Sequence, residues 1–130
     1  MKKGTMTKSN EDYLEAILVT QRKKGVCRSI DVALHLGVSK PSVTVAMTHL
    51  EQMGLVKRDL SQGKALTLTS EGMERAQNVL ERHEFVAQVL CALGVPREVA
   101  EEDACKIEHD ISQTSFDKMR DWYAQHQKQG

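Results

Sequence analysis

The sequence predicts a mainly α-helical fold with one small β-hairpin, and three observations lead to this prediction. Apolar residues recur every three or four positions along most of the chain, which is the spacing of amphipathic helices. A short turn at Gly37-Val38 separates two such helices, as in a helix-turn-helix. Two short segments of strand composition follow, at 55–60 and 65–68, joined by turn residues. The order predicts a winged helix-turn-helix with a small β-hairpin wing, followed by a second, α-helical domain.

The first two helices have recognisable ends. Ser9 is expected to cap the first helix, because an acidic residue follows three positions later, and Gly25 is expected to end it. The second helix is expected to open at Arg28 or Ser29 and to close at Gly37.

The third helix is expected to begin after Ser39, with Pro41 in its first turn, where proline is tolerated. Val43, Met47 and Leu50 form its buried stripe. Lys40, Thr44, Val45, Thr48 and His49 are expected on its opposite, exposed face.

The rest of the chain reads as the wing and further helices. Turn residues at 61–64 connect the two predicted strands, and Thr69-Ser70-Glu71 caps a long helix that runs to about Leu93. Gly94-Val95-Pro96 breaks it, a further helix covers 96–111, and a last helix begins near Phe116. The predicted domains are 1–72, the winged helix, and 73–130, the helical domain.

Composition points to a water-soluble globular protein. Of 130 residues, 40% are hydrophobic and 28% charged, and no apolar run approaches the ~20 residues that span a bilayer. We therefore expect no membrane partner. Three widely spaced cysteines indicate reduced thiols and a cytoplasmic location. Residues 1–72 hold 11 Lys/Arg and 7 Asp/Glu, and residues 73–130 hold 7 and 11, so the first domain suits phosphate and the second suits cations.

The third helix is the candidate DNA-reading element. A helix enters the major groove of B-DNA and meets base edges mainly through its first turns, while basic residues of the wing meet phosphates. The candidate contacts are Ser39, Lys40, Pro41, Ser42 and Thr44 on the helix, and Lys57, Arg58 and Lys64 on the wing.

A second set of residues has the chemistry of a transition-metal site. Cys105, Glu108 and His109 stand at i, i+3 and i+4, so they leave one face of the predicted 96–111 helix together. Asp12 and Glu15 form a similar pair on the first helix, and His83 lies on the long helix. Thiolate, imidazole and carboxylate are transition-metal ligands. We expect Ala100, Ala104, Ile107 and Ile111 to point inward, with the ligands flanking that stripe. Glu101, one turn before Cys105, could add a ligand, but we expect it to be solvated.

Five segments together resemble the diphtheria-toxin-repressor family, which includes the iron-dependent repressors and the manganese transport regulators. They are residues 10–15 (Asn-Glu-Asp-Tyr-Leu-Glu), 36–44, 66–72, Arg82-His83-Glu84 and 103–109. The resemblance implies a homodimer on palindromic double-stranded DNA, with a divalent cation held between the winged helix and a helical metal-binding and dimerisation domain. It implies Asp12, Glu15, His83, Glu108 and His109 as ligands, and a repressor of metal-uptake genes rather than an enzyme.

Cys105 departs from the manganese branch, which has glutamate at this position, whereas Asp12 departs from the iron branch, which has methionine. The carboxylates suit Mn²⁺, and the thiolate suits Fe²⁺, Co²⁺, Zn²⁺ or Cd²⁺. The expected cofactor is therefore Mn²⁺ or Fe²⁺, with the other ions able to bind in vitro.

Three other functions compete with this interpretation. A MarR-type winged-helix regulator would sense oxidation or a small ligand through Cys105 or an apolar pocket. A metalloenzyme is disfavoured, because the sequence has no His-Glu-x-x-His motif. A metal-buffering module would leave Ser39-Lys40-Pro41-Ser42 and the wing without a role.

Overall fold

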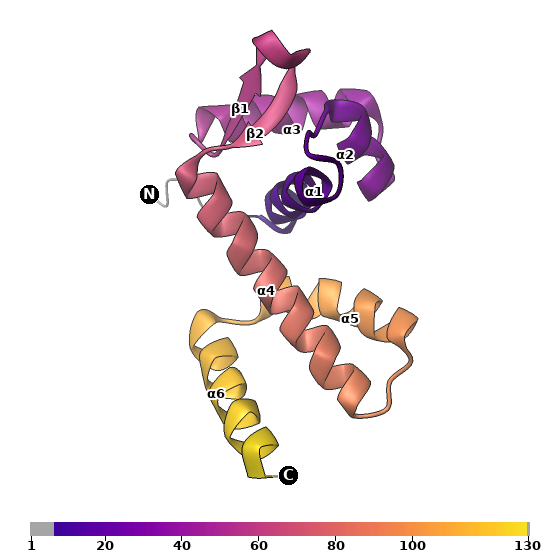
Figure 1. Ribbon diagram of the computed structural model, residues 1–130, viewed down its shortest axis with the longest axis vertical. Coiled ribbons are helices and arrows are strands. Elements are labelled where there is room, and N and C mark those ends of the chain that lie inside the picture. The colour runs from indigo at the N-terminus through magenta and orange to yellow at the C-terminus, as the bar shows by residue number, and fades with distance from the viewer. Residues whose placement is uncertain (1–6, 130) are drawn as a thin grey trace. The chain divides into compact units, whose positions relative to one another are not determined.

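The computed structural model describes residues 7–129 and confirms the mainly α-helical fold (Figure 1). It divides into two compact units, one ending at Asn78 and the other beginning at Val79. The first holds the three N-terminal helices, the hairpin and the start of the long helix α4 (Ser70–Ala92), and the second holds the rest of α4 and two further helices.

The helix-turn-helix consists of α2 (Ser29–Leu36) and α3 (Lys40–Gln52), with α1 (Lys8–Lys24) packed against both. The predicted cap of α1 was wrong by two residues, because it is the Thr7 hydroxyl that accepts the backbone N–H of Asn10 at 3.1 Å. The predicted cap of α3 is confirmed, since Ser39 accepts the N–H of Ser42 at 3.2 Å. The short turn between α2 and α3 relies on Gly37, whose φ of 68° suits a residue without Cβ.

The wing is an antiparallel hairpin of β1 (Val56–Asp59) and β2 (Ala65–Leu68), in which Val56 pairs with Leu68 and Asp59 with Ala65. The first strand is shorter than the predicted 55–60, because the Asp59 carboxylate accepts the N–H of Ser61 and starts a 3-10 turn, η1 (Leu60–Gln62).

The first unit has a core of aliphatic side chains from all its elements. Its fully buried members include Leu14, Ile17, Val32, Val43, Met47, Leu50, Leu55 and Leu66. The start of α4 approaches this core closely, since a Cβ built on Gly72 would lie 1.9 Å from the carbonyl oxygen of Leu55. Glycine is therefore required where α4 leaves the wing.

In the second unit, α5 (Arg97–Asp110) and α6 (Gln113–Gln129) pack against the later part of α4. Val86, Ala87 and Ala104 form one buried cluster between α4 and α5. Phe85 of α4 meets Phe116 of α6 edge to face, with ring centroids 5.4 Å apart.

The last helix begins at Gln113, three residues before the predicted start, because the hydroxyl of Ser112 accepts the N–H of Ser115 and caps it. Among the described residues, no helix combines the length and apolar character needed to cross a membrane.

Candidate metal centre and nucleic-acid interface

Helix α5 carries three of the six candidate metal ligands, and one of them lies deeper than the sequence predicts. Ala100, Ala104 and Glu108 are the buried residues of α5, and Glu108 is 1% exposed. The prediction that Ile107 points inward was wrong, since it is 38% exposed, and Ile111 is only partly buried. Residues four apart share one helix face, so the stripe that begins at Ala100 and Ala104 continues to the carboxylate.

The ligand atoms of this unit converge on Glu108. Cys105, Glu108 and His109 each offer one donor atom within 4.8 Å of the others. The Glu108 carboxylate places Oε1 3.2 Å from Nε2 of His109 and Oε2 3.0 Å from Nδ1 of His83, which reaches it from α4. Thus three of the predicted metal ligands gather around a fourth, the buried Glu108 carboxylate.

The surroundings of this carboxylate fit a cation. Within residues 7–129, neither oxygen of Glu108 accepts a hydrogen bond, although both are buried. Arg82 is nearby, but its Nη1 donates to the backbone carbonyls of Glu108 and Ile111, at 2.9 and 2.8 Å. A buried carboxylate needs compensation, and a bound divalent cation supplies it where the hydrogen bonds do not.

Glu101 also lies at this centre, although it is not one of the six predicted ligands. It was expected to be solvated, yet its Oε2 hydrogen-bonds Nε2 of His83, and its Oε1 lies 3.2 Å from a guanidinium nitrogen of Arg97. The contact joins α4 and α5 across 18 positions of sequence, so no local pattern could have indicated it.

The other two predicted ligands, Asp12 and Glu15, belong to the first unit. They lie three residues apart on α1, both are partly buried, and their spacing puts them on one side of the helix. Their participation in the metal centre remains a prediction.

The exposed face of α3 is the candidate DNA-reading surface, and its hydroxyl groups are engaged within the helix. Ser39 and Ser42 share a hydrogen bond between their hydroxyls at 2.9 Å, and the Thr44 hydroxyl donates to the carbonyl of Lys40 at 3.1 Å. Val45 is 71% exposed beside them. This surface therefore presents methyl groups as well as polar atoms.

The three basic residues of the wing differ in their surroundings. Lys57 and Lys64 are exposed, and Lys64 follows Gly63 in the turn with a φ of 62°. Arg58 instead reaches back to α3, where it donates to the Thr48 hydroxyl at 3.0 Å and lies 3.3 Å from the carboxylate of Glu51. Its guanidinium thus braces the wing against the reading helix.

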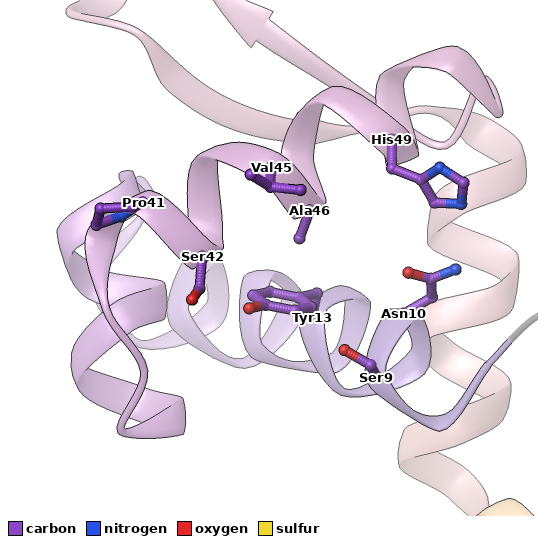
Figure 2. A pocket seen from close by; sticks show the side chains of 8 residues that line it. All are labelled: Ser9, Asn10, Tyr13, Pro41, Ser42, Val45, Ala46 and His49. Atoms are coloured by element: carbon purple, nitrogen blue, oxygen red, sulfur yellow. The ribbon is translucent and has the colours of Figure 1, made fainter.

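A groove of about 490 Å³ runs between α1 and the exposed side of α3 (Figure 2). Ser9, Asn10 and Tyr13 line it from α1, and Pro41, Ser42, Val45, Ala46 and His49 line it from α3. Candidate contact residues Pro41 and Ser42 thus share a concave surface with the start of α1.

Comparison with known proteins identifies two matching domain models along the chain. Residues 5–63 match the model described as iron dependent repressor, N-terminal DNA binding domain. Residues 69–128 match the model described as iron dependent repressor, metal binding and dimerisation domain. Together they favour the metal-dependent family over the MarR-type alternative.

Curated relatives agree with the models. The transcriptional regulator MntR of Escherichia coli O157:H7 is 38% identical over 110 residues, which cover 85% of this chain and 70% of the relative. The HTH-type transcriptional regulator MntR of Bacillus subtilis (strain 168) is 35% identical over 115 residues, covering 88% of this chain and 80% of the relative.

Solved structures share the fold. The IdeR of T. acidophilum superposes with a TM-score of 0.76 at 25% identity, over 92% of this chain and 55% of that one. A manganese-dependent transcriptional repressor in complex with manganese gives a TM-score of 0.75 at 25% identity, over 84% of this chain and 50% of that one. The chain thus spans about half the length of these two proteins. With both domain models matched in order, the chain belongs to the iron-dependent repressor family of metal-dependent transcriptional regulators.

Proposed function

We propose that this protein is a metal-activated transcriptional repressor of metal-ion uptake genes, which binds its operator DNA when a divalent cation is bound. The observation that carries the proposal is the buried Glu108 carboxylate, which lies within 3.2 Å of two imidazoles and accepts no hydrogen bond in the described part of the chain. Such a group is costly to maintain unless a cation compensates it.

The proposed ligands are the six residues predicted from the sequence. Cys105, Glu108 and His109 of α5 and His83 of α4 would hold the cation within the helical unit, and Asp12 and Glu15 of α1 would complete the site. A divalent cation supplies two positive charges to a set that includes the three carboxylates of Asp12, Glu15 and Glu108. Because the ligands come from both domains, occupancy would couple to DNA binding, by roughly 1–3 kcal/mol for each linked event.

The identity of the metal depends on Cys105. Oxygen donors from Asp12, Glu15 and Glu108 suit Mn²⁺, while a thiolate strengthens binding of Fe²⁺ and of softer ions. We therefore expect Fe²⁺ to activate the protein as well as Mn²⁺, and Cys105→Glu to shift the preference toward Mn²⁺.

The proposed DNA target is a double-stranded, palindromic operator read by a homodimer. Two copies of α3 would enter successive major grooves, about 34 Å apart. Ser39, Lys40, Pro41, Ser42 and Thr44 would contact DNA through the start of α3, and Lys57, Arg58 and Lys64 through the wing. The exposed Val45 offers an apolar contact for the methyl group of thymine.

An apolar groove of about 360 Å³ on the helical unit is the surface that we propose for dimerisation. Phe85, Val89, Met119, Trp122 and Tyr123 line it, and Trp122 is 59% exposed. The matched domain model for this region is a dimerisation domain, so a second copy of the chain is the expected occupant. Met119→Glu should yield a monomer in sedimentation velocity, whereas Gln125→Glu, on an exposed part of the same helix, should not.

The decisive experiment compares DNA binding with and without metal. A duplex is first selected from a randomised library with the wild-type protein and Mn²⁺, and binding is then titrated with Mn²⁺ or, anaerobically, Fe²⁺. Glu108→Ala and His109→Ala should abolish the metal response while circular dichroism stays native, and Glu102→Ala, at an exposed position on α5, should leave it intact. A normal response in either ligand variant would overturn the site assignment.

A further inference from the structure

The imidazole of His83, on α4, lies between two carboxylates that both belong to α5. Its Nε2 hydrogen-bonds Oε2 of Glu101, and its Nδ1 lies 3.0 Å from Oε2 of Glu108. The two carboxylates lie about two turns apart on the same side of α5. They differ in exposure, since the side chain of Glu101 is 38% exposed and that of Glu108 is 0% exposed.

The hydrogen-bond geometry distinguishes the two ring nitrogens. A carboxylate only accepts hydrogen bonds, so the hydrogen between Glu101 and His83 belongs to Nε2. The other ring nitrogen, Nδ1, lies 3.0 Å from Oε2 of Glu108. A neutral imidazole that carries its hydrogen on Nε2 has its lone pair on Nδ1, the nitrogen that a cation at Glu108 would meet.

We propose that Glu101 is a positioning residue that fixes the Nε2–H tautomer of His83 and turns its Nδ1 toward the cation held by Glu108. The proposal rests on the proposed function for the cation itself. A carboxylate behind a ligating histidine orients the ring and raises the basicity of its ligating nitrogen, and loss of such a partner typically weakens metal binding about 10- to 100-fold.

Arg97 contributes to the same arrangement from one turn earlier on α5. Its guanidinium lies 3.2 Å from Oε1 of Glu101, which leaves Oε2 for His83. Glu101 thus has one oxygen for each partner. Since Arg97 is largely exposed, the main effect should reside in Glu101.

The test uses the full chain as wild type, Glu101→Ala, Glu101→Gln and the control Glu102→Gln, which alters the neighbouring exposed residue. The tautomer of His83 is read in the metal-free protein at pH 8 from two-bond ¹⁵N–¹H correlations, assigned by comparison with His83→Gln. Mn²⁺ affinity and stoichiometry are measured by calorimetry.

Glu101→Ala should lose the single Nε2–H tautomer and bind Mn²⁺ about 10- to 100-fold more weakly at unchanged stoichiometry. Glu101→Gln keeps an acceptor, so it should keep the tautomer and bind Mn²⁺ with intermediate affinity, and Glu102→Gln should match the wild type. An unchanged tautomer in Glu101→Ala would overturn the proposal, and so would loss of one equivalent of Mn²⁺, because Glu101 would then be a ligand. If the wild type bound no Mn²⁺, the proposed function would fail, and the tautomer measurement would still decide the role of Glu101.

Discussion

Oε2 of Glu108 lies 3.0 Å from Nδ1 of His83, and this approach of a buried carboxylate to an imidazole is the centre of the helical unit. Neither oxygen of Glu108 accepts a hydrogen bond within residues 7–129. The helical unit therefore buries a carboxylate that is poorly solvated, and a bound cation would compensate its charge.

Replacing Glu108 by glutamine should stabilise the protein without metal and remove its stabilisation by metal. Without metal, Glu108→Gln removes a buried charge and keeps its shape, so the free energy of unfolding should rise by about 1 kcal/mol or more. With Mn²⁺ at about 100 times its dissociation constant, the wild type should gain about 2.7 kcal/mol and the variant almost nothing. Thermal unfolding with and without Mn²⁺ measures both effects, and Glu102→Gln serves as the control. A destabilised variant in the absence of metal would contradict the argument.

Several helix ends follow from local sequence, but the buried position of Glu108 does not. Gly25 and Gly37 end helices because glycine readily adopts a positive φ, and Ser39 begins one because its hydroxyl accepts a backbone N–H, as the structure confirms. A hydrophobic pattern assigns isoleucine to the core. It therefore placed Ile107 on the inward side of α5 and Glu108 at the edge of that side. The contact of Glu101 with His83 is tertiary, and no spacing along the chain encodes it.

The N-terminal cap of α1 is another feature that the local sequence alone does not determine. Thr7 and Ser9 both have hydroxyls that suit a helix cap, and an acidic residue follows either of them within a turn. The backbone of Thr7 is extended, with a ψ of 163°, whereas Ser9 is already helical. Serine is the more favoured of the two at this position, yet the conformation of the chain selects Thr7.

Cys27 should be the least reactive thiol of the chain. It is 0% exposed, and burial raises the pKa of its thiol from 9.0 to about 11, with the nearby Asp31 carboxylate adding to the effect. At pH 8 about one molecule in a thousand would carry the thiolate, which is the reactive form. Alkylation of the native protein by iodoacetamide, followed by peptide mass spectrometry, should label the partly buried Cys91 well before Cys27. Equal rates at the two positions would show that the first unit opens more readily than its packing implies.

Asp31 should make the first unit more stable at neutral pH than in acid. A hydrogen bond from Lys24 Nζ at 2.6 Å, together with the backbone N–H of Arg28 at 2.9 Å, lowers the pKa of the Asp31 carboxyl below its usual 3.8. A lowered pKa in the folded state contributes stability above pH 3.8, and this contribution is lost as the pH falls through the folded-state value.

The comparison of wild type with Asp31→Asn measures this contribution. The wild type should be the more stable at pH 7, by less than about 1 kcal/mol because the ion pair lies near solvent. The difference should shrink below pH 4 in urea unfolding curves. A difference that stays constant from pH 7 to pH 3 would mean that the charge of Asp31 is not involved.

The contacts of Arg58 indicate a role in addition to the proposed phosphate contact. Its guanidinium donates to the Thr48 hydroxyl at 3.0 Å and lies 3.3 Å from Glu51, so it both braces the wing and neutralises a carboxylate on the reading helix. Without Arg58, the charge of Glu51 would face the phosphates unpaired, and DNA binding should fall by more than the loss of one phosphate contact.

A double-mutant cycle separates the two contributions. In the selected duplex with Mn²⁺, Arg58→Ala should weaken binding more in the wild-type background than in a Glu51→Ala background, with a coupling of roughly 0.5–3 kcal/mol. Lys57→Ala, at an exposed position on the same strand, should instead weaken binding independently of Glu51 and reduce the slope of log affinity against log salt by about 0.9. Additive effects of Arg58→Ala and Glu51→Ala would mean that Arg58 acts on DNA directly. If Arg58 acted by neutralising Glu51, the effect of Arg58→Ala on DNA affinity would depend on whether the Glu51 carboxylate is present.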